Sequence, residues 1–238
     1  MDIYGVDFTS APGRRKPITT ALSKFFSDRL EVIEFKDLFD FESFENMLKL
    51  PGPWIAGFDF PFGQSRKLVT NLDWPLTWEG YVGCVAEMSK EQYIETLNAY
   101  KKYRKAGDKE HRRTTDVLAS SISPQKLYGV PVGKMFFEGA PRLLRSDLNI
   151  QPVRPNADNR IAIEAYPALL ARRWVGKQGY KSDTRANQTE KLSRARKEIA
   201  RGIMSPEFKT LYGFALDCSV DKIERIIDDA TGDQMDSL

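Results

Sequence analysis

The segment Ile3-Tyr-Gly-Val-Asp7-Phe-Thr-Ser-Ala-Pro-Gly13 starts with a short apolar run that stops at an acid and runs into a turn. Apolar runs of this length, bounded by turn residues, are typical of buried strands. The pattern returns in Trp54-Ile-Ala-Gly-Phe-Asp59-Phe-Pro-Phe-Gly63, and again in Ile161-Ala-Ile-Glu164. Three separate strands are therefore predicted to end on a carboxylate.

The segments around these strands predict a mixed α/β fold. Residues 18–26 and 30–35 have strand composition and follow the first strand as two successive hairpins. A short amphipathic helix follows from residue 41, because apolar residues recur there at helical spacing. Beyond residue 167 the sequence reads as helical, with three helices predicted over residues 186–201, after Ser205 and after Ser219.

Composition places the chain among ordinary globular proteins. Its 238 residues are 41% hydrophobic and 29% charged, with a formal net charge of +3, so we expect one domain over residues 1–238. The only cysteines, Cys84 and Cys218, lie far apart, which favours neither a disulfide framework nor a zinc site. We find no signal peptide and no apolar run of membrane-spanning length, so we expect a cytoplasmic protein without a membrane partner.

The acids at the strand ends point to a metal site. If Asp7, Asp59 and Glu164 share one sheet edge, their charges repel one another unless a cation compensates. Carboxylate oxygens suit Mg²⁺ or Mn²⁺, and two such ions about 4 Å apart serve phosphoryl hydrolysis. The alternative is that a polar residue ends a strand simply because it meets solvent.

Two more acids lie near the end of the sequence. Asp233 and Asp236 are three residues apart and would share a helix face, so they are candidates for the remaining metal ligands. Thr231 and Gln234 also have capping-box spacing, and acids are favoured in any first helical turn. The sequence ends at Leu238, two residues after Asp236, which is very short for a helix that has only just begun. We therefore expect the natural helix to be longer.

The order of strands and acids resembles the ribonuclease H-like superfamily, and in particular a family of proteins predicted to be ribonuclease H-like nucleases. The resemblance covers nearly the whole chain. It rests on Gly5-Val-Asp7-Phe-Thr-Ser-Ala-Pro-Gly13, Gly57-Phe-Asp59-Phe-Pro-Phe-Gly63, Gly129-Val-Pro-Val-Gly-Lys-Met135, Ile163-Glu164-Ala-Tyr-Pro167, Tyr180-Lys-Ser182 and Gly232-Asp-Gln-Met-Asp236.

The resemblance implies a five-stranded mixed sheet flanked by helices, with the first three strands antiparallel. It implies that Asp7 is the central metal ligand, that Asp59 is the second, and that Asp233 and Asp236 are the acids of the last helix, as in RuvC-like resolvases. Glu164 is a further catalytic candidate that either contacts metal or orients neighbouring groups. Members of the family continue past the last acidic motif with a helix of small residues, which this sequence lacks.

Residues 64–153 are expected to form a helical insertion, or cap, beside the acidic edge. This segment is rich in Lys and Arg, and Arg112, Arg113 and Lys134 are our candidates for contacts to substrate phosphates. The alternative is a solvated, charged helix face. His111 is the only histidine, and we expect it to be exposed or to cap a helix.

The predicted function is a metal-dependent nuclease that acts on DNA or RNA with Mg²⁺ or Mn²⁺. A second possibility is a non-catalytic nucleic-acid-binding module that keeps the fold and the basic cap. A third is a phosphotransferase of the actin and sugar-kinase kind, which also has a first-strand aspartate, but the chain has no duplicated domain and no glycine-rich phosphate loop.

Overall fold

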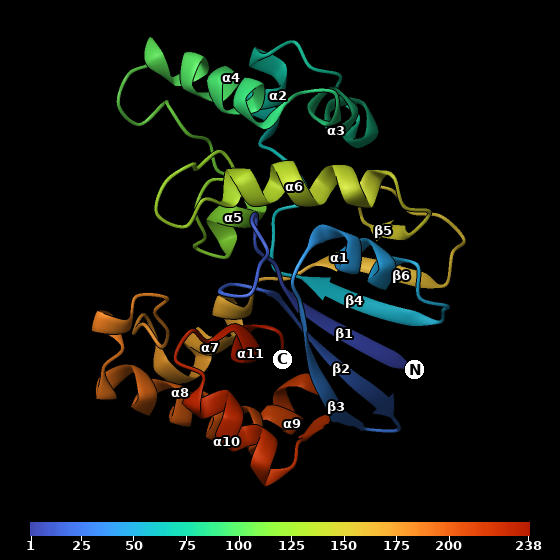
Figure 1. Ribbon diagram of the computed structural model, residues 1–238, viewed down its shortest axis with the longest axis vertical. Helices are drawn as coiled ribbons and strands as arrows, with labels where there is room; N and C mark the ends of the chain where they lie inside the picture. The colour runs from blue at the N-terminus through green and yellow to red at the C-terminus, as the bar shows by residue number, and fades with distance from the viewer.

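A mixed sheet of seven strands, in the order β5-β6-β4-β1-β2-β3-β7, forms the centre of the computed structural model, which describes residues 1–238 (Figure 1). The strands are β1 (Asp2–Asp7), β2 (Ile18–Phe26), β3 (Arg29–Leu38), β4 (Trp54–Phe58), β5 (Asn149–Gln151), β6 (Arg160–Glu164) and β7 (Ala215–Asp217). Strand β2 pairs antiparallel with both β1 and β3, which confirms the arrangement expected for the first three strands. Strands β1, β4, β6 and β5 run parallel to one another.

The prediction of five strands is wrong, because the sheet has two more. Strands β5 and β7 have only three residues each and extend the sheet at its two edges, where they pair parallel with β6 and β3. Three residues are too few to show an alternating pattern. Strand β7 lies in a region predicted to be helical, and β5 lies near the end of the predicted helical insertion over residues 64–153.

One face of the sheet is covered by the helices of the first two thirds of the chain. They are α1 (Phe41–Leu48), α2 (Arg66–Asn71), α3 (Trp78–Ala86), α4 (Lys90–Lys102), α5 (Thr114–Leu118) and α6 (Val132–Leu144). In Figure 1, α2, α3 and α4 lie above α6, and α6 lies between them and the sheet. The buried side chains of Phe58 from β4, Phe44 from α1 and Phe136 from α6 belong to one core. Helix α6 is thus part of the main core layer.

The last third of the chain covers the other face. Its helices are α7 (Pro167–Val175), the 3₁₀ helix η1 (Arg185–Asn187), α8 (Glu190–Ile203), α9 (Pro206–Tyr212), α10 (Val220–Asp228) and α11 (Asp233–Asp236). They form a second core with β3, to which Val32, Ile199 and Met235 contribute. None of the helices in the chain combines the length and the apolar character needed to span a membrane.

The starts of α4 and α11 are capped in different ways. Ser89 and Gln92 form a capping box at the start of α4, with both reciprocal hydrogen bonds present. The capping box predicted for Thr231 and Gln234 is wrong, because Gly232 is the N-cap of α11. The Asp229 carboxylate instead accepts hydrogen bonds from the backbone N–H groups of Thr231 and Gln234, at 3.1 and 2.9 Å.

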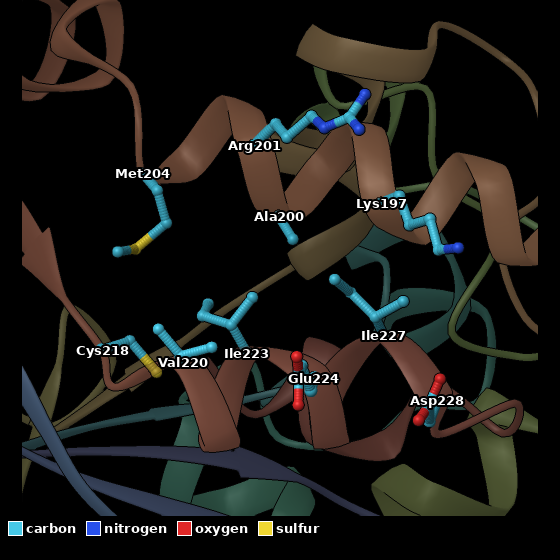
Figure 2. Close-up of a pocket in the computed structure, with 10 residues that line it drawn as sticks. All are labelled: Lys197, Ala200, Arg201, Met204, Cys218, Val220, Ile223, Glu224, Ile227 and Asp228. Carbon is cyan, nitrogen blue, oxygen red and sulfur yellow. The ribbon is translucent and has the colours of Figure 1, made fainter.

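A groove of about 670 Å³ lies between α8 and α10, on the side of the second core away from the sheet (Figure 2). Its walls are apolar, and its rims carry opposite charge, with Lys197 and Arg201 on α8 and Glu224 and Asp228 on α10. No acid of the strand ends lines this groove. The groove therefore has no part in the site described next.

Candidate metal centre

Two carboxylates lie side by side at the carboxyl edge of the sheet. Strand β1 ends at Asp7, and β4 is followed directly by Asp59. The two strands are parallel and in register, with Val6 opposite Phe58, and the Asp59 N–H donates to the Val6 carbonyl at 2.9 Å. The sequence therefore delivers both acids to the same edge, as predicted.

The third acid comes from the short helix at the end of the chain. Oxygens of Asp7, Asp59 and Asp236 all lie within 4.8 Å of one another. Helix α11 reaches β1 because residue 5 is a glycine: a β carbon there would lie 1.9 Å from the Ser237 carbonyl oxygen. Strand β1 thus provides both Asp7 and, at Gly5, the space that lets α11 bring Asp236 close to it.

Burial makes this cluster electrostatically costly. Asp7 is 7% exposed, and burial, together with the nearby charges of Asp233 and Asp59, raises its pKa to about 8, although Lys181 and Lys16 act in the opposite direction. Burial, with a smaller effect from Glu164, raises the pKa of Asp59 to about 6. Neither carboxylate is stabilised by a hydrogen bond. The two strand acids, Asp7 buried and Asp59 half-buried, therefore offer carboxylate oxygens without a protein donor.

Asp236 differs from the strand acids because its oxygens have protein partners. The Tyr180 hydroxyl donates to Asp236 Oδ1 at 2.5 Å, and the Lys181 ammonium pairs with Asp236 Oδ2. Buried Arg196 donates to the Tyr180 carbonyl at 2.8 Å and to the Ile227 carbonyl at 2.6 Å. Arg196 thus ties the segment that carries Tyr180 and Lys181 to the end of α10, close to α11.

Asp233, which we expect to bind metal, is placed differently. It is buried, and its Oδ1 accepts a hydrogen bond from the Lys16 ammonium at 2.6 Å. The same ammonium also donates to Asp183 at 2.8 Å. Asp233 is outside the group of three converging carboxylates, although its charge contributes to the raised pKa of Asp7. We therefore regard Asp233 as the anchor of Lys16 at the edge of the cluster.

Glu164 also lies outside that group of three and has other partners. The Arg113 guanidinium donates to both of its oxygens, at 2.6 and 2.7 Å, and the Phe62 N–H donates to Oε2 at 2.8 Å. Arg113 makes a second ion pair, with the buried Asp116, at 2.6 Å. Glu164 therefore joins β6 to α5, which agrees with the orienting role considered for it.

The three expected phosphate-binding residues differ in exposure and in partners. Arg113 is held by the two carboxylates of Glu164 and Asp116. Arg112 is exposed, and Lys134 is half-buried in the first turn of α6. His111 is buried, contrary to expectation, and its Nε2 lies 2.6 Å from the Tyr100 hydroxyl. Burial is the main cause of its lowered pKa.

Sequence reasoning gave no role to the two lysines of the site. Lys181 stands in the segment 180–182, which was part of the resemblance, and Lys16 follows two arginines in the turn after β1. A lysine close to an acidic motif would have been only a weak signal for these contacts, because the paired residues lie far apart in the sequence. Lys16 and Asp233 are 217 residues apart, and Lys181 and Asp236 are 55 residues apart. Only the fold brings these pairs together.

The fold and the site define a mixed α/β protein with a buried carboxylate cluster at the carboxyl edge of its parallel strands. Comparison with known proteins finds no matching family model, no matching curated protein and no matching solved structure.

Proposed function

We propose that this chain is a divalent-metal-dependent nuclease of ribonuclease H-like type, which hydrolyses phosphodiester bonds in nucleic acid. The observation that carries the proposal is the convergence of Asp7, Asp59 and Asp236 within 4.8 Å, with Asp7 buried and lacking a hydrogen-bond donor. Buried charges are normally paired or bound to metal. An unpaired, buried carboxylate among other carboxylates is best explained by a cation.

The ligand set fits Mg²⁺ or Mn²⁺. All three groups are carboxylates, and hard oxygen ligands are those that these two ions prefer. The group contains neither histidine nor cysteine, which argues against zinc or copper. When bound, such a metal lowers the pKa of a coordinated water and neutralises charge on phosphoryl oxygens.

The residues of the chain have separable parts in this proposal. Asp7 and Asp59 would hold the metal from two rigid, in-register strands, which is the kind of support that a precise site needs. Asp236 would complete the set from α11, oriented by the Tyr180 hydroxyl. Glu164 and Arg113 would fix the loop after β4, because the Phe62 N–H is bonded to the same carboxylate.

Positive charge beside the acids supports a polyanionic substrate. Arg14 and Arg15 are exposed in the turn that follows β1, between the residues of the Gly13 to Lys16 bridge. Lys16 fastens this turn to the acidic cluster through Asp233. Two arginines held next to a metal site suit the phosphate backbone of DNA or RNA.

The test is cleavage of a nucleic acid panel by the full-length protein. Single- and double-stranded DNA and RNA are incubated with Mg²⁺, with Mn²⁺ and with EDTA. We expect cleavage only with metal, and we expect Asp7→Asn to lower the rate by at least about 100-fold, in line with the loss of a group central to charge stabilisation. Asp221→Asn, at an exposed position in the first turn of α10, is the matched control and should cleave like the wild type.

Two results would count against the nuclease. Absence of cleavage of every substrate with either metal would remove the activity, and equal cleavage by Asp7→Asn would show that the activity does not come from this site. Salt-dependent nucleic acid binding without turnover would favour the binding module instead. The ion pair of Lys181 with Asp236 is the observation that keeps this second candidate open, because it fills part of the cluster with a protein cation.

A further inference from the structure

Lys181 places a positive charge inside the acidic cluster. Its ammonium pairs with Oδ2 of Asp236, a carboxylate whose side chain is 2% exposed. Its charge also lowers the pKa of both Asp7 and Asp59, against the larger effect of burial. The ammonium therefore acts on all three of the converging carboxylates.

The stem of Lys181 is held against the turn that begins α11. The Ser182 N–H donates to the Ala230 carbonyl at 3.1 Å, which ties the two segments together. Gly232 has a φ of +75°, and a β carbon on it would lie 2.7 Å from the Lys181 β carbon. Close packing of this kind fixes where the side chain starts, while the side chain as a whole is 38% exposed, which leaves solvent beside it.

The charges of the site explain why this matters for metal. Five carboxylates, from Asp7, Asp59, Asp183, Asp233 and Asp236, share two ammonium groups, from Lys16 and Lys181. Lys16 bonds two carboxylates outside the converging group, whereas Lys181 occupies an oxygen of one of the three. A divalent cation bound by those three would compete for that oxygen and would repel the ammonium.

We propose that Lys181 is a tethered competitor for the metal: its ammonium neutralises the empty cluster and must leave Asp236 when a divalent cation binds. This inference rests on the proposed metal site. Lys181 then lowers metal affinity in the free protein, while its displaced ammonium stays beside the site on its fixed stem. The ion pair thus reduces the electrostatic cost of bringing the three carboxylates together in the absence of metal.

The experiment compares Mn²⁺ affinity across variants of the full chain, measured by the electron paramagnetic resonance signal of free Mn²⁺. Lys181→Met keeps much of the apolar stem and removes the charge, so we expect it to bind Mn²⁺ at least about tenfold more tightly than the wild type. Lys181→Arg keeps the charge and should stay within about threefold of the wild type. Lys177→Met, an exposed lysine in the preceding turn, should not differ from the wild type.

The outcomes separate this inference from the metal site itself. Equal or weaker binding by Lys181→Met, with binding abolished in Asp7→Asn, would overturn the role of Lys181 and leave the site standing. Absence of Mn²⁺ binding in both the wild type and Lys181→Met would overturn both. A crystal structure of the wild type with Mn²⁺ gives a second measurement that needs no variant: loss of the contact between Lys181 and Asp236 supports competition, and its retention overturns it.

Discussion

Asp7 concentrates the electrostatic conflict of the site in one residue. It ends β1, which pairs with β2 on one side and with β4 on the other, so its carboxylate becomes buried when the sheet forms. A buried carboxylate favours its protonated form, and the charges of Asp233 and Asp59 add to that effect. The residue thus opposes folding when it is ionised and has no metal.

This conflict predicts how stability depends on pH without metal. The pKa of Asp7 is raised to about 8 from 3.8, so the folded protein binds a proton that the unfolded chain has lost over much of this range. The free energy of unfolding should therefore fall as pH rises from about 4 to 8, with each pH unit costing at most about 1.4 kcal/mol from this group. Asp59 contributes in the same direction up to a pH of about 6.

Urea denaturation in EDTA, at several pH values, measures the effect. Asp7→Asn removes the titrating group, so its stability relative to the wild type should increase by at least about 1 kcal/mol between pH 5 and pH 8. Asp221→Asn serves again as the control and should follow the wild type. A relative stability of Asp7→Asn that stays constant with pH would show that Asp7 is not buried as an unpaired acid.

We expect Glu164 to support the structure of the site and not to bind the metal itself. Glu164→Gln breaks the bidentate ion pair with Arg113 while keeping an oxygen for the Phe62 N–H. The pair is partly exposed, so we expect a loss of about 1–2 kcal/mol in the free energy of unfolding. Mn²⁺ affinity should stay within about threefold of the wild type, and a loss of tenfold or more would make Glu164 a metal ligand after all.

At the scale of elements, the site depends on the close approach of α11 to β1. This helix has only four residues and would not be stable alone. It is held by Asp229 at its start, by Tyr180 and Lys181 on its acid, and by packing of Ser237 against Gly5. The position of Asp236 is therefore decided by these contacts and not by helix propensity.

Gly5→Ala tests that dependence. The added methyl group would lie 1.9 Å from the Ser237 carbonyl oxygen, so α11 must move away from β1 and carry Asp236 with it. We expect a loss of about 1–3 kcal/mol in the free energy of unfolding, typical of overpacking, and Mn²⁺ binding weakened by at least about tenfold. Isothermal titration calorimetry and urea denaturation measure the two effects.

The matched control is Gly13→Ala, because a β carbon at Gly13 meets no atom within 4 Å. This glycine lies in the turn after β1 and close to Lys16 in sequence, so it controls for a substitution in the same region. Wild-type Mn²⁺ affinity in Gly5→Ala would contradict the proposed role of α11.

At the scale of the whole molecule, the sequence predicted the strand acids well and their surroundings poorly. Asp7 and Asp59 end apolar runs of ordinary strand length, and this local pattern can be recognised in the sequence without knowledge of the fold. Strands β5 and β7 are three residues long, and their existence depends on pairing with β6 and β3. Such edge strands leave no periodic pattern to read.

The same distinction separates the predicted ligands from the missed cations. Asp236 was found through a motif, but the pairing of Lys16 with Asp233 depends on how the two ends of the chain pack together. The pairing of Lys181 with Asp236 depends on contact between segments that lie 55 residues apart. Arg113 was expected to contact substrate phosphates, and the structure shows it paired with Glu164 and Asp116, which make it part of the scaffold. Long-range ion pairs of this kind follow from the fold, which residue spacing does not describe.

The most direct test of the central claim is a crystal structure of the full chain grown with Mn²⁺ and measured at a wavelength where manganese scatters anomalously. We expect an anomalous peak bounded by oxygens of Asp7, Asp59 and Asp236, at distances of about 2.0–2.3 Å. We expect no such peak in Asp7→Asn. A wild-type structure without such a peak at saturating Mn²⁺, with the three carboxylates still converging, would contradict the account.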